Sequence, residues 1–151
     1  MIRTELAFEA HVLLSDMIVV GPSSHGFRRV VPIIGGTFEG PRVRGRVLPS
    51  GQDHQFVRPD GVLELEARYV LETDDGVPIV VVNRGLRRAS AEVVERLTRG
   101  EIVPASEYYF RTCAQFETPL ESRYAWLNAA LFIGQAERLP NAAVVRFYEV
   151  L

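Results

Sequence analysis

The sequence contains no lysine, one cysteine and one tryptophan. Because all 17 basic residues are arginine, the chain has no amine for a Schiff base and no P-loop lysine. This excludes Schiff-base aldolases, pyridoxal enzymes and P-loop nucleotide hydrolases. The single cysteine, Cys113, excludes an internal disulfide and a cysteine-held zinc or iron–sulfur centre, and it fits a reducing compartment.

Long apolar runs and a dominant charge are also absent. No apolar run approaches the about 20 residues that a membrane span needs, and Glu5 and Glu9 interrupt the start where a signal peptide would be apolar. A net charge of −2 gives no broad basic surface. His11, His25 and His54 lack the spacing of zinc ligands, and no dinucleotide-binding G-x-G-x-x-G occurs. We therefore expect a cytoplasmic protein without metal, cofactor, nucleic-acid or membrane partners.

Apolar and polar residues alternate with a period of two along most of the chain, which is typical of strands. Asp60-Gly61 and Asp75-Gly76 predict tight hairpin turns, and Gly35-Gly36 a bulge or bend. One short peripheral helix is predicted between Ser90, as its N-cap, and Gly100. The predicted strands span residues 5–14, 26–34, 42–48, 52–58, 62–72, 77–84, 107–117, 125–136 and 143–150.

The 151 residues are enough for one domain and too few for two. Consecutive strands with short turns favour an antiparallel barrel or sandwich over alternating strands and helices. A closed barrel removes the exposed edges that so many strands would otherwise leave. We therefore predict an all-β fold, a single antiparallel β-barrel of eight to ten strands over residues 1–151.

Three segments carry candidate site residues. Asp53 either projects into a barrel cavity, as a general base or ligand anchor, or caps the turn after Gly51. In residues 108–117, a polar face that includes Arg111 either lines a cavity, where Arg111 would hold an anionic group, or lies on the solvated outside. Tyr124-Ala125-Trp126-Leu127-Asn128 combines an amphipathic aromatic with an amide, as in a pocket wall, although a single Trp is more often part of the core.

Several motifs together resemble a known bacterial and fungal family, domain of unknown function 3237, from about residue 5 to the C-terminus. The resemblance implies an antiparallel barrel similar to the allene oxide cyclase and dirigent barrels, commonly self-associating and with no established general activity. It also singles out Asp53, Tyr69, Asn83, Arg111, Trp126 and Asn128 as positions that turns or core packing do not explain. The motifs are Ile33-Ile34-Gly35-Gly36-Thr37-Phe38-Glu39-Gly40-Pro41, Gly45-Arg46-Val47-Leu48-Pro49, Gly51-Gln52-Asp53, Arg58-Pro59-Asp60-Gly61, Thr73-Asp74-Asp75-Gly76, Asn83-Arg84-Gly85, Tyr109-Phe110-Arg111-Thr112 and Tyr124-Ala125-Trp126-Leu127-Asn128.

These observations lead to one function hypothesis and two alternatives. The hypothesis is a small-molecule-binding barrel that catalyses a cofactor-independent lyase, isomerase or cyclisation step on a hydrophobic, oxygenated metabolite. Asp53 would accept a proton and Arg111 would hold an anionic oxygen. The alternatives are a non-catalytic barrel of lipocalin type and an oligomeric interaction protein with a filled barrel. A homo-oligomer is expected, and a dimer is its favoured form. The predicted ligand-binding residues are Tyr69, Asn83, Phe116, Trp126 and Asn128.

Overall fold

The computed structural model describes all residues from 1 to 151 and contains ten strands. One α-helix, α1 (Ala91–Thr98), and two short 3₁₀ helices, η1 (Ala105–Glu107) and η2 (Ala125–Ala129), connect some of them. The strands are β1 (Thr4–Leu14), β2 (Ile18–Ser23), β3 (Gly26–Glu39), β4 (Arg44–Val47), β5 (Gln52–Val57), β6 (Leu63–Thr73), β7 (Pro78–Arg88), β8 (Tyr109–Glu117), β9 (Leu131–Leu139) and β10 (Ala142–Val150).

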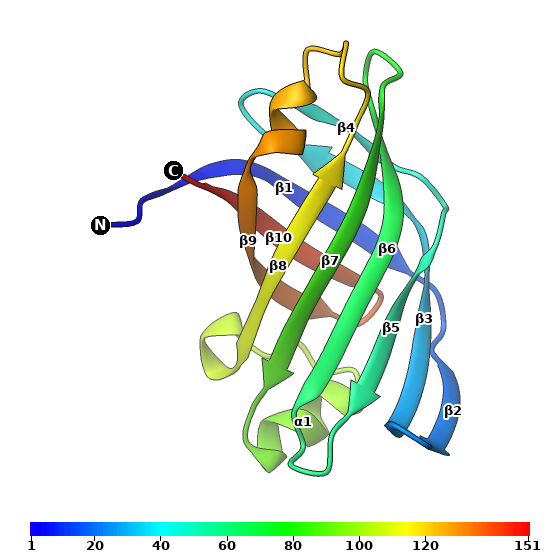
Figure 1. Ribbon diagram of the computed structural model, residues 1–151. Coiled ribbons are helices and arrows are strands. Elements are labelled where there is room, and N and C mark those ends of the chain that lie inside the picture. The colour runs from blue at the N-terminus through cyan, green and yellow to red at the C-terminus, as the bar shows by residue number, and fades with distance from the viewer.

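The strands close into an antiparallel barrel, which confirms the predicted fold class (Figure 1). β1 pairs with β10 on one side and with β3 on the other, which joins the two ends of the sheet. β4 and β5 each pair with both β3 and β6, so together they occupy one position in the wall and the closed barrel has eight. β2 pairs with β3 alone and extends beyond the closed wall.

The long strand β3 makes this closure possible by bending at Gly35 and Gly36. Both glycines have positive φ angles, 152° and 130°, which side chains rarely tolerate. A Cβ at Gly36 would also collide with the carbonyl oxygen of His11 on β1. The predicted bend is therefore present, but the strand continues through it to Glu39 instead of ending there.

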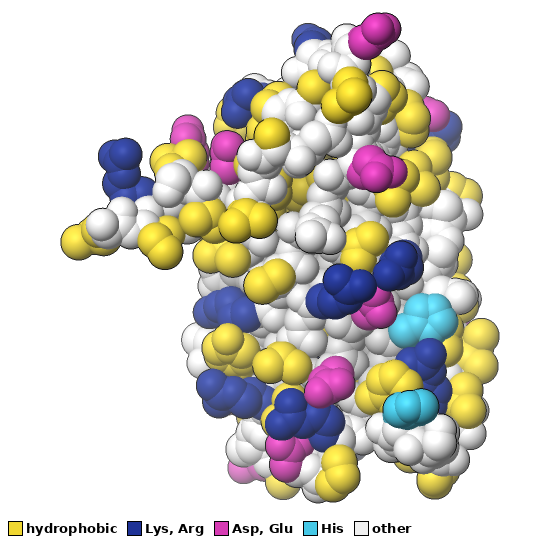
Figure 2. Space-filling view, in the orientation of Figure 1, with side chains coloured by type: hydrophobic (Ala, Val, Ile, Leu, Met, Phe, Trp, Pro, Cys, Tyr) yellow, Lys and Arg dark blue, Asp and Glu magenta, His cyan; other side chains and the backbone are white.

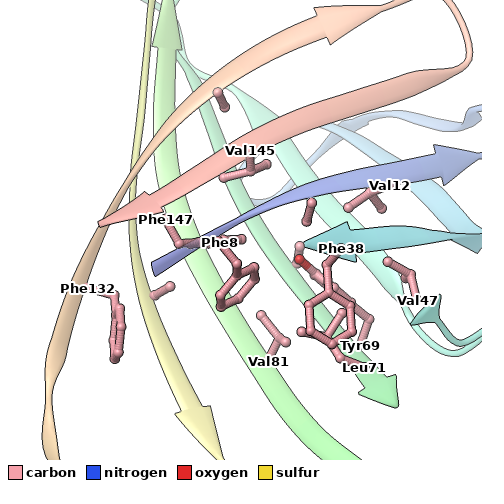
Figure 3. Packing of buried hydrophobic residues seen from close by; sticks show 14 of the residues in the cluster. Phe8, Val12, Phe38, Val47, Tyr69, Leu71, Val81, Phe132, Val145 and Phe147 are labelled. Atoms are coloured by element: carbon pink, nitrogen blue, oxygen red, sulfur yellow. The ribbon is translucent and has the colours of Figure 1, made fainter. Parts of the chain in front are cut away.

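Strand alternation decides which side chains fill the barrel. Along β6, Leu63, Leu65, Ala67, Tyr69 and Leu71 are buried while the intervening residues are more exposed. An aromatic cluster occupies part of the interior, and Figure 3 shows its members Phe8, Phe38, Phe132 and Phe147 from close by. Its ring centroids lie 4.8–5.4 Å apart, a distance typical of packed aromatic pairs. The cluster consists of Phe8, Phe38, Phe116, Phe132 and Phe147.

The two ends of the barrel differ. α1 lies at the lower end in Figure 1, with the side chain of Ser90 accepting a hydrogen bond from the N–H of Val93, as predicted for its N-cap. η2 lies at the upper end. The strand predicted over residues 125–136 is wrong in its first part, because residues 125–129 form η2 and the strand begins only at Leu131. None of the helices has the length and apolar character to cross a bilayer.

Candidate functional site

A cavity of about 140 Å³ opens at the end of the barrel where α1 lies. Polar side chains from β3, β5, β7 and β9 line it, against apolar residues that include Phe110. A second cavity of about 40 Å³ shares Asp53 and Phe110 with the first and lies among mostly buried residues. The two cavities together form the candidate site. Its polar residues are Arg29, Asp53, Gln55, Arg87 and Arg138 around the larger cavity, and Tyr69, Asn83 and Thr112 around the smaller one.

The ladder between β7 and β8 shows how these residues are ordered along the barrel. Val81 pairs with Phe116 of the aromatic cluster, Asn83 pairs with Ala114 two residues further on, and Arg87 pairs with Phe110 near the end of the strand. Because alternate residues share a face, Asn83 and Arg87 point inward with Val81. The interior therefore changes from an aromatic core, through buried polar groups, to the larger cavity. The opening of this cavity, which Arg29, Arg87 and Arg138 line, is called the mouth below.

Asp53 is the central titratable group of this site. Its Oδ2 accepts a hydrogen bond from Nε2 of Gln55 at 2.8 Å, and Oε1 of Gln55 accepts one from Nε of Arg29 at 2.9 Å. The other carboxyl oxygen, Oδ1, is buried without a partner. Burial raises the pKa of Asp53 to about 6, although Gln55, Arg87 and Arg29 lower it. A carboxyl group with this pKa can both accept and donate a proton near neutral pH.

The smaller cavity adds polar atoms that the protein leaves unsatisfied. Oδ1 of Asn83 and Oγ1 of Thr112 are buried without hydrogen-bond partners, as is Oδ1 of Asp53. Burial raises the pKa of Tyr69, so its hydroxyl stays protonated and can donate. Each unsatisfied buried group costs about 1–3 kcal/mol. Three such atoms around one cavity give it unused hydrogen-bonding capacity.

Three arginines surround the mouth: Arg29, Arg87 and Arg138. Burial is the largest cause that lowers the pKa of each, and it brings that of Arg87 to about 10. Mutual repulsion contributes, because Arg138 and Arg29 also lower the pKa of Arg87. All three remain charged at neutral pH and make the mouth electropositive.

The structure brings together three of the predicted site residues, Asp53, Tyr69 and Asn83. It places Arg111 elsewhere, on the exposed outer face of β8, where its guanidinium donates to the carbonyl oxygen of Phe110 at 3.0 Å. Arg111 lines an outer groove of about 650 Å³ with Tyr109 and other residues. Of the two interpretations of this polar face, the structure thus supports the solvated outside, and Arg111 does not face Asp53.

The remaining predicted residues lie away from the Asp53 cavities. Phe116 belongs to the aromatic cluster, 4.8 Å from the ring of Phe132. The Trp126 ring lies under the guanidinium of Arg42, whose Cζ is 3.8 Å from the ring centroid. Asn128 accepts from the N–H of Thr118 at 2.8 Å and donates to its carbonyl oxygen at 3.0 Å, which is a structural role.

Sequence reasoning missed Arg29, Gln55, Arg87, Thr112 and Arg138. A usable signal was the phase of the alternation. Gln55 follows Asp53 by two residues and Arg87 follows Asn83 by four, so each pair lies on one face of its strand, although apolar residues of β7 occur at both parities. No group of three His, Cys, Asp or Glu side chains is arranged to hold a metal ion.

The comparisons with known proteins agree with this architecture. Residues 2–150 match the sequence model of the family described as "Protein of unknown function (DUF3237)". The UPF0311 protein RPA1785 of Rhodopseudomonas palustris is 39% identical over 150 residues, which cover 99% of this chain and 97% of that protein. Its crystal structure superposes with a TM-score of 0.96 and covers 100% of this chain and 99% of the other.

Two further solved structures are similar. A protein of unknown function from Clostridium acetobutylicum is 37% identical, with a TM-score of 0.89 and coverage of 100% of this chain and 98% of the other. An enzyme from Penicillium herquei is 19% identical, with a TM-score of 0.72 and coverage of 99% and 95%, so that likeness concerns the fold alone. The match along nearly the whole length shows that the chain belongs to the DUF3237 family of proteins of unknown function.

Proposed function

We propose that the barrel binds a small oxygenated organic molecule at Asp53 and catalyses a cofactor-independent proton transfer on it, as an isomerase, cyclase or lyase. The observation that carries this proposal is the Asp53 carboxyl group. The residue is half-buried, its Oδ1 is buried without a partner, its pKa is raised to about 6, and it lines both cavities. Groups with such environments cluster at catalytic sites.

The neighbouring residues can support this chemistry. Oδ1 of Asp53 would take a proton from a carbon beside a carbonyl group or from a hydroxyl group, and the Tyr69 hydroxyl would donate a hydrogen bond to the oxygen that gains charge. The protonated Asp53 would then return the proton to another atom of the same molecule. An isomerisation or ring closure of this kind needs no oxidant, reductant or co-reactant.

The lipocalin-type alternative uses the same cavities without turnover, so a measurement of proton transfer separates the two. We would incubate small aryl ketones such as phenylacetone with the protein in D₂O and follow the loss of the C–H signals beside the carbonyl group by NMR. The wild type should accelerate exchange, and Asp53→Asn should reduce the acceleration at least 100-fold, the usual contribution of general acid–base catalysis. Asp74→Asn, an exposed aspartate paired with Arg44, is the matched control.

Two outcomes would count against catalysis. Exchange equal in wild type and Asp53→Asn would remove the proposed role of Asp53. Ligand binding without exchange, across a set of small aryl ketones, would favour the storage or carrier barrel.

The filled-barrel alternative has support only in the aromatic part of the interior, which side chains fill. Its test is whether any small molecule binds at the mouth.

The expected homodimer stays a prediction. β2 lies at the edge of the sheet, and its Ile18, Val19 and Val20 are 55–59% exposed, which makes this strand a candidate contact for a second copy. Light scattering of the purified protein decides between a monomer and a dimer.

A further inference from the structure

The three arginines at the mouth come from three separate strands. Arg29 lies near the start of β3, Arg87 near the end of β7 and Arg138 near the end of β9. All three are half-buried and line the same cavity as Asp53. Strand alternation places each of these side chains on the inner face of its strand. Because the barrel is closed, the three inner faces meet, and the fold concentrates three guanidiniums at one opening.

These arginines differ from those on the outside of the barrel. On the outer face, basic and acidic side chains lie next to one another (Figure 2), and Glu66, for example, pairs with Arg68 at 3.0 Å and with Arg84 at 2.8 Å. No ion pair of the structure includes Arg29, Arg87 or Arg138. Most surface arginines of this protein form ion pairs, and the three arginines of the mouth differ from them in forming none.

The charge of the mouth is also unbalanced. The only carboxylates that line the larger cavity are those of Asp16 and Asp53, so three positive charges face at most two negative ones. A single negative charge on a ligand would balance this excess. Guanidinium groups bind carboxylates through paired hydrogen bonds, and each of these three guanidiniums has N–H donors that no group of the protein accepts.

The hydrogen bonds within the site show which donors remain. Arg29 donates to Gln55 through Nε, Arg138 donates to the carbonyl oxygen of Leu97 through one Nη, and the guanidinium of Arg87 lies 5.8 Å from the ring centroid of Phe110. The terminal nitrogens of Arg29 and Arg87 are thus available to a ligand. Arg138 has a second role, because its bond to Leu97 anchors α1.

Beyond the arginines the site becomes apolar. The smaller cavity is lined by Val12, Ile33, Leu65, Ala67 and Val145 together with the unpaired polar atoms of Asn83 and Thr112. A cavity of about 150 Å³ holds a benzene ring in other proteins, and the two adjoining cavities here measure about 140 Å³ and about 40 Å³, so a ring fits only if it extends through both. The opening therefore suits a molecule with an anionic end and a body of about one ring.

We propose that Arg29, Arg87 and Arg138 bind the carboxylate of the substrate, so that the substrate class of this site is an organic monocarboxylic acid that enters with its apolar end first. That the bound acid is a substrate rests on the proposed function. That the ligand is an acid rests on the positions of the three arginines alone. Binding in this direction places the carbon atoms near the carboxylate beside Asp53, where the proton transfer would occur.

The test compares two probes of equal shape. Benzoate and benzamide differ in charge but not in size, so we would titrate each into ¹⁵N-labelled protein and follow the backbone amide signals of Asp53, Asn83 and Arg87. Benzoate should bind at least tenfold more tightly than benzamide. Arg87→Gln and Arg29→Gln should each weaken benzoate binding at least fivefold and leave benzamide binding unchanged.

Arg88→Gln is the matched control, because Arg88 is the next residue on β7 but lies on the exposed outer face, stacked 4.3 Å from the ring centroid of Tyr109. It should leave both affinities unchanged. Should an arginine variant fail to fold, the comparison of the two probes on the wild type still decides.

Each remaining outcome overturns the inference. Equal affinity for benzoate and benzamide would show that the mouth does not select an anion. Binding of phenyl phosphate but not benzoate would assign the site to phosphate esters, and binding of none of the three would show that the arginines hold no small anion. The deuterium exchange of phenylacetone, which carries no charge, tests the proposed function separately, so the two can fail independently.

Discussion

Gln55 donates from Nε2 to Oδ2 of Asp53 over 2.8 Å, two residues apart on the same inward face of β5. This bond fixes the orientation of the carboxyl group, while Oδ1 has no hydrogen-bond partner within the protein. Gln55 is itself held by Arg29 at 2.9 Å, so the position of Asp53 depends on a chain of side chains that ends at the mouth. A group held through one oxygen and open at the other suits repeated proton transfer to a bound molecule.

The raised pKa of Asp53 predicts a pH-dependent stability. Folding raises this pKa from 3.8 to about 6. Below about pH 3 the carboxyl group is protonated in both states and there is no penalty. Between pH 4 and 6 the native state binds more protons than the unfolded state, so stability falls as the pH rises. Above pH 6 the full penalty applies, about 3 kcal/mol for a shift of this size.

Replacement by a neutral isostere should remove this penalty. Asp53→Asn keeps an oxygen that accepts from Gln55, so the advantage of the variant over the wild type should grow by about 3 kcal/mol between about pH 3 and pH 7. Urea unfolding at several pH values measures the difference. The exposed Asp74→Asn serves as control and should show no such growth. A stability difference that stays constant with pH would contradict the burial of an ionised Asp53.

Two asparagines that the sequence grouped together should respond in opposite ways. Asn83→Leu removes the unpaired buried Oδ1 and fills the adjoining cavity, so we expect a gain of about 1–2 kcal/mol. Asn128→Leu removes two hydrogen bonds and leaves the N–H and C=O of Thr118 unpaired, so we expect a loss of similar size. Thermal unfolding compares both. Destabilisation by Asn83→Leu would indicate that Asn83 has a partner within the protein.

The alternation of apolar and polar residues predicts some side-chain orientations from the sequence and leaves others undecided. The period of two correctly assigned Tyr69 to the buried face of its strand, because Leu65, Ala67 and Leu71 share its parity. It did not assign the polar face of β8, since a row of polar residues is compatible with a wet cavity or with solvent. Only the closure of the barrel, through the pairing of β1 with β3, decides that Arg111 lies outside.

The arginines at the mouth were not predicted, because their proximity too depends on the closure of the barrel. An arginine near a strand end usually reaches into solvent, and nothing local to Arg29, Arg87 or Arg138 shows that their strands converge. They are 51 to 109 positions apart along the chain. Asp53 and Asn83 were found because they interrupt apolar strands within family motifs, whereas the positive charge of their surroundings is a property of the assembled barrel.

The uncompensated charge at the mouth should lower stability. Arg87→Met keeps much of the apolar stem and removes one of three mutually repelling guanidiniums, so we expect stabilisation by about 1–3 kcal/mol. For a domain of this size that raises Tm by about 2–4 °C per kcal/mol. Arg88→Met, on the outer face, should change Tm little. A lower Tm for Arg87→Met would mean that its guanidinium stabilises the empty barrel.

The placement of Arg111 yields the last prediction. Its guanidinium lies on the outer face and contacts the carbonyl oxygen of Phe110, so the barrel wall separates it from Asp53. Arg111→Ala should therefore leave benzoate affinity and deuterium exchange within twofold of the wild type, while Arg87→Gln weakens benzoate binding at least fivefold. A tenfold loss on Arg111→Ala alone, with an unchanged Tm, would move the ligand to the outer groove beside Tyr109 and Cys113. In that case the free thiol of Cys113, which is exposed there, should become protected from alkylation by the ligand.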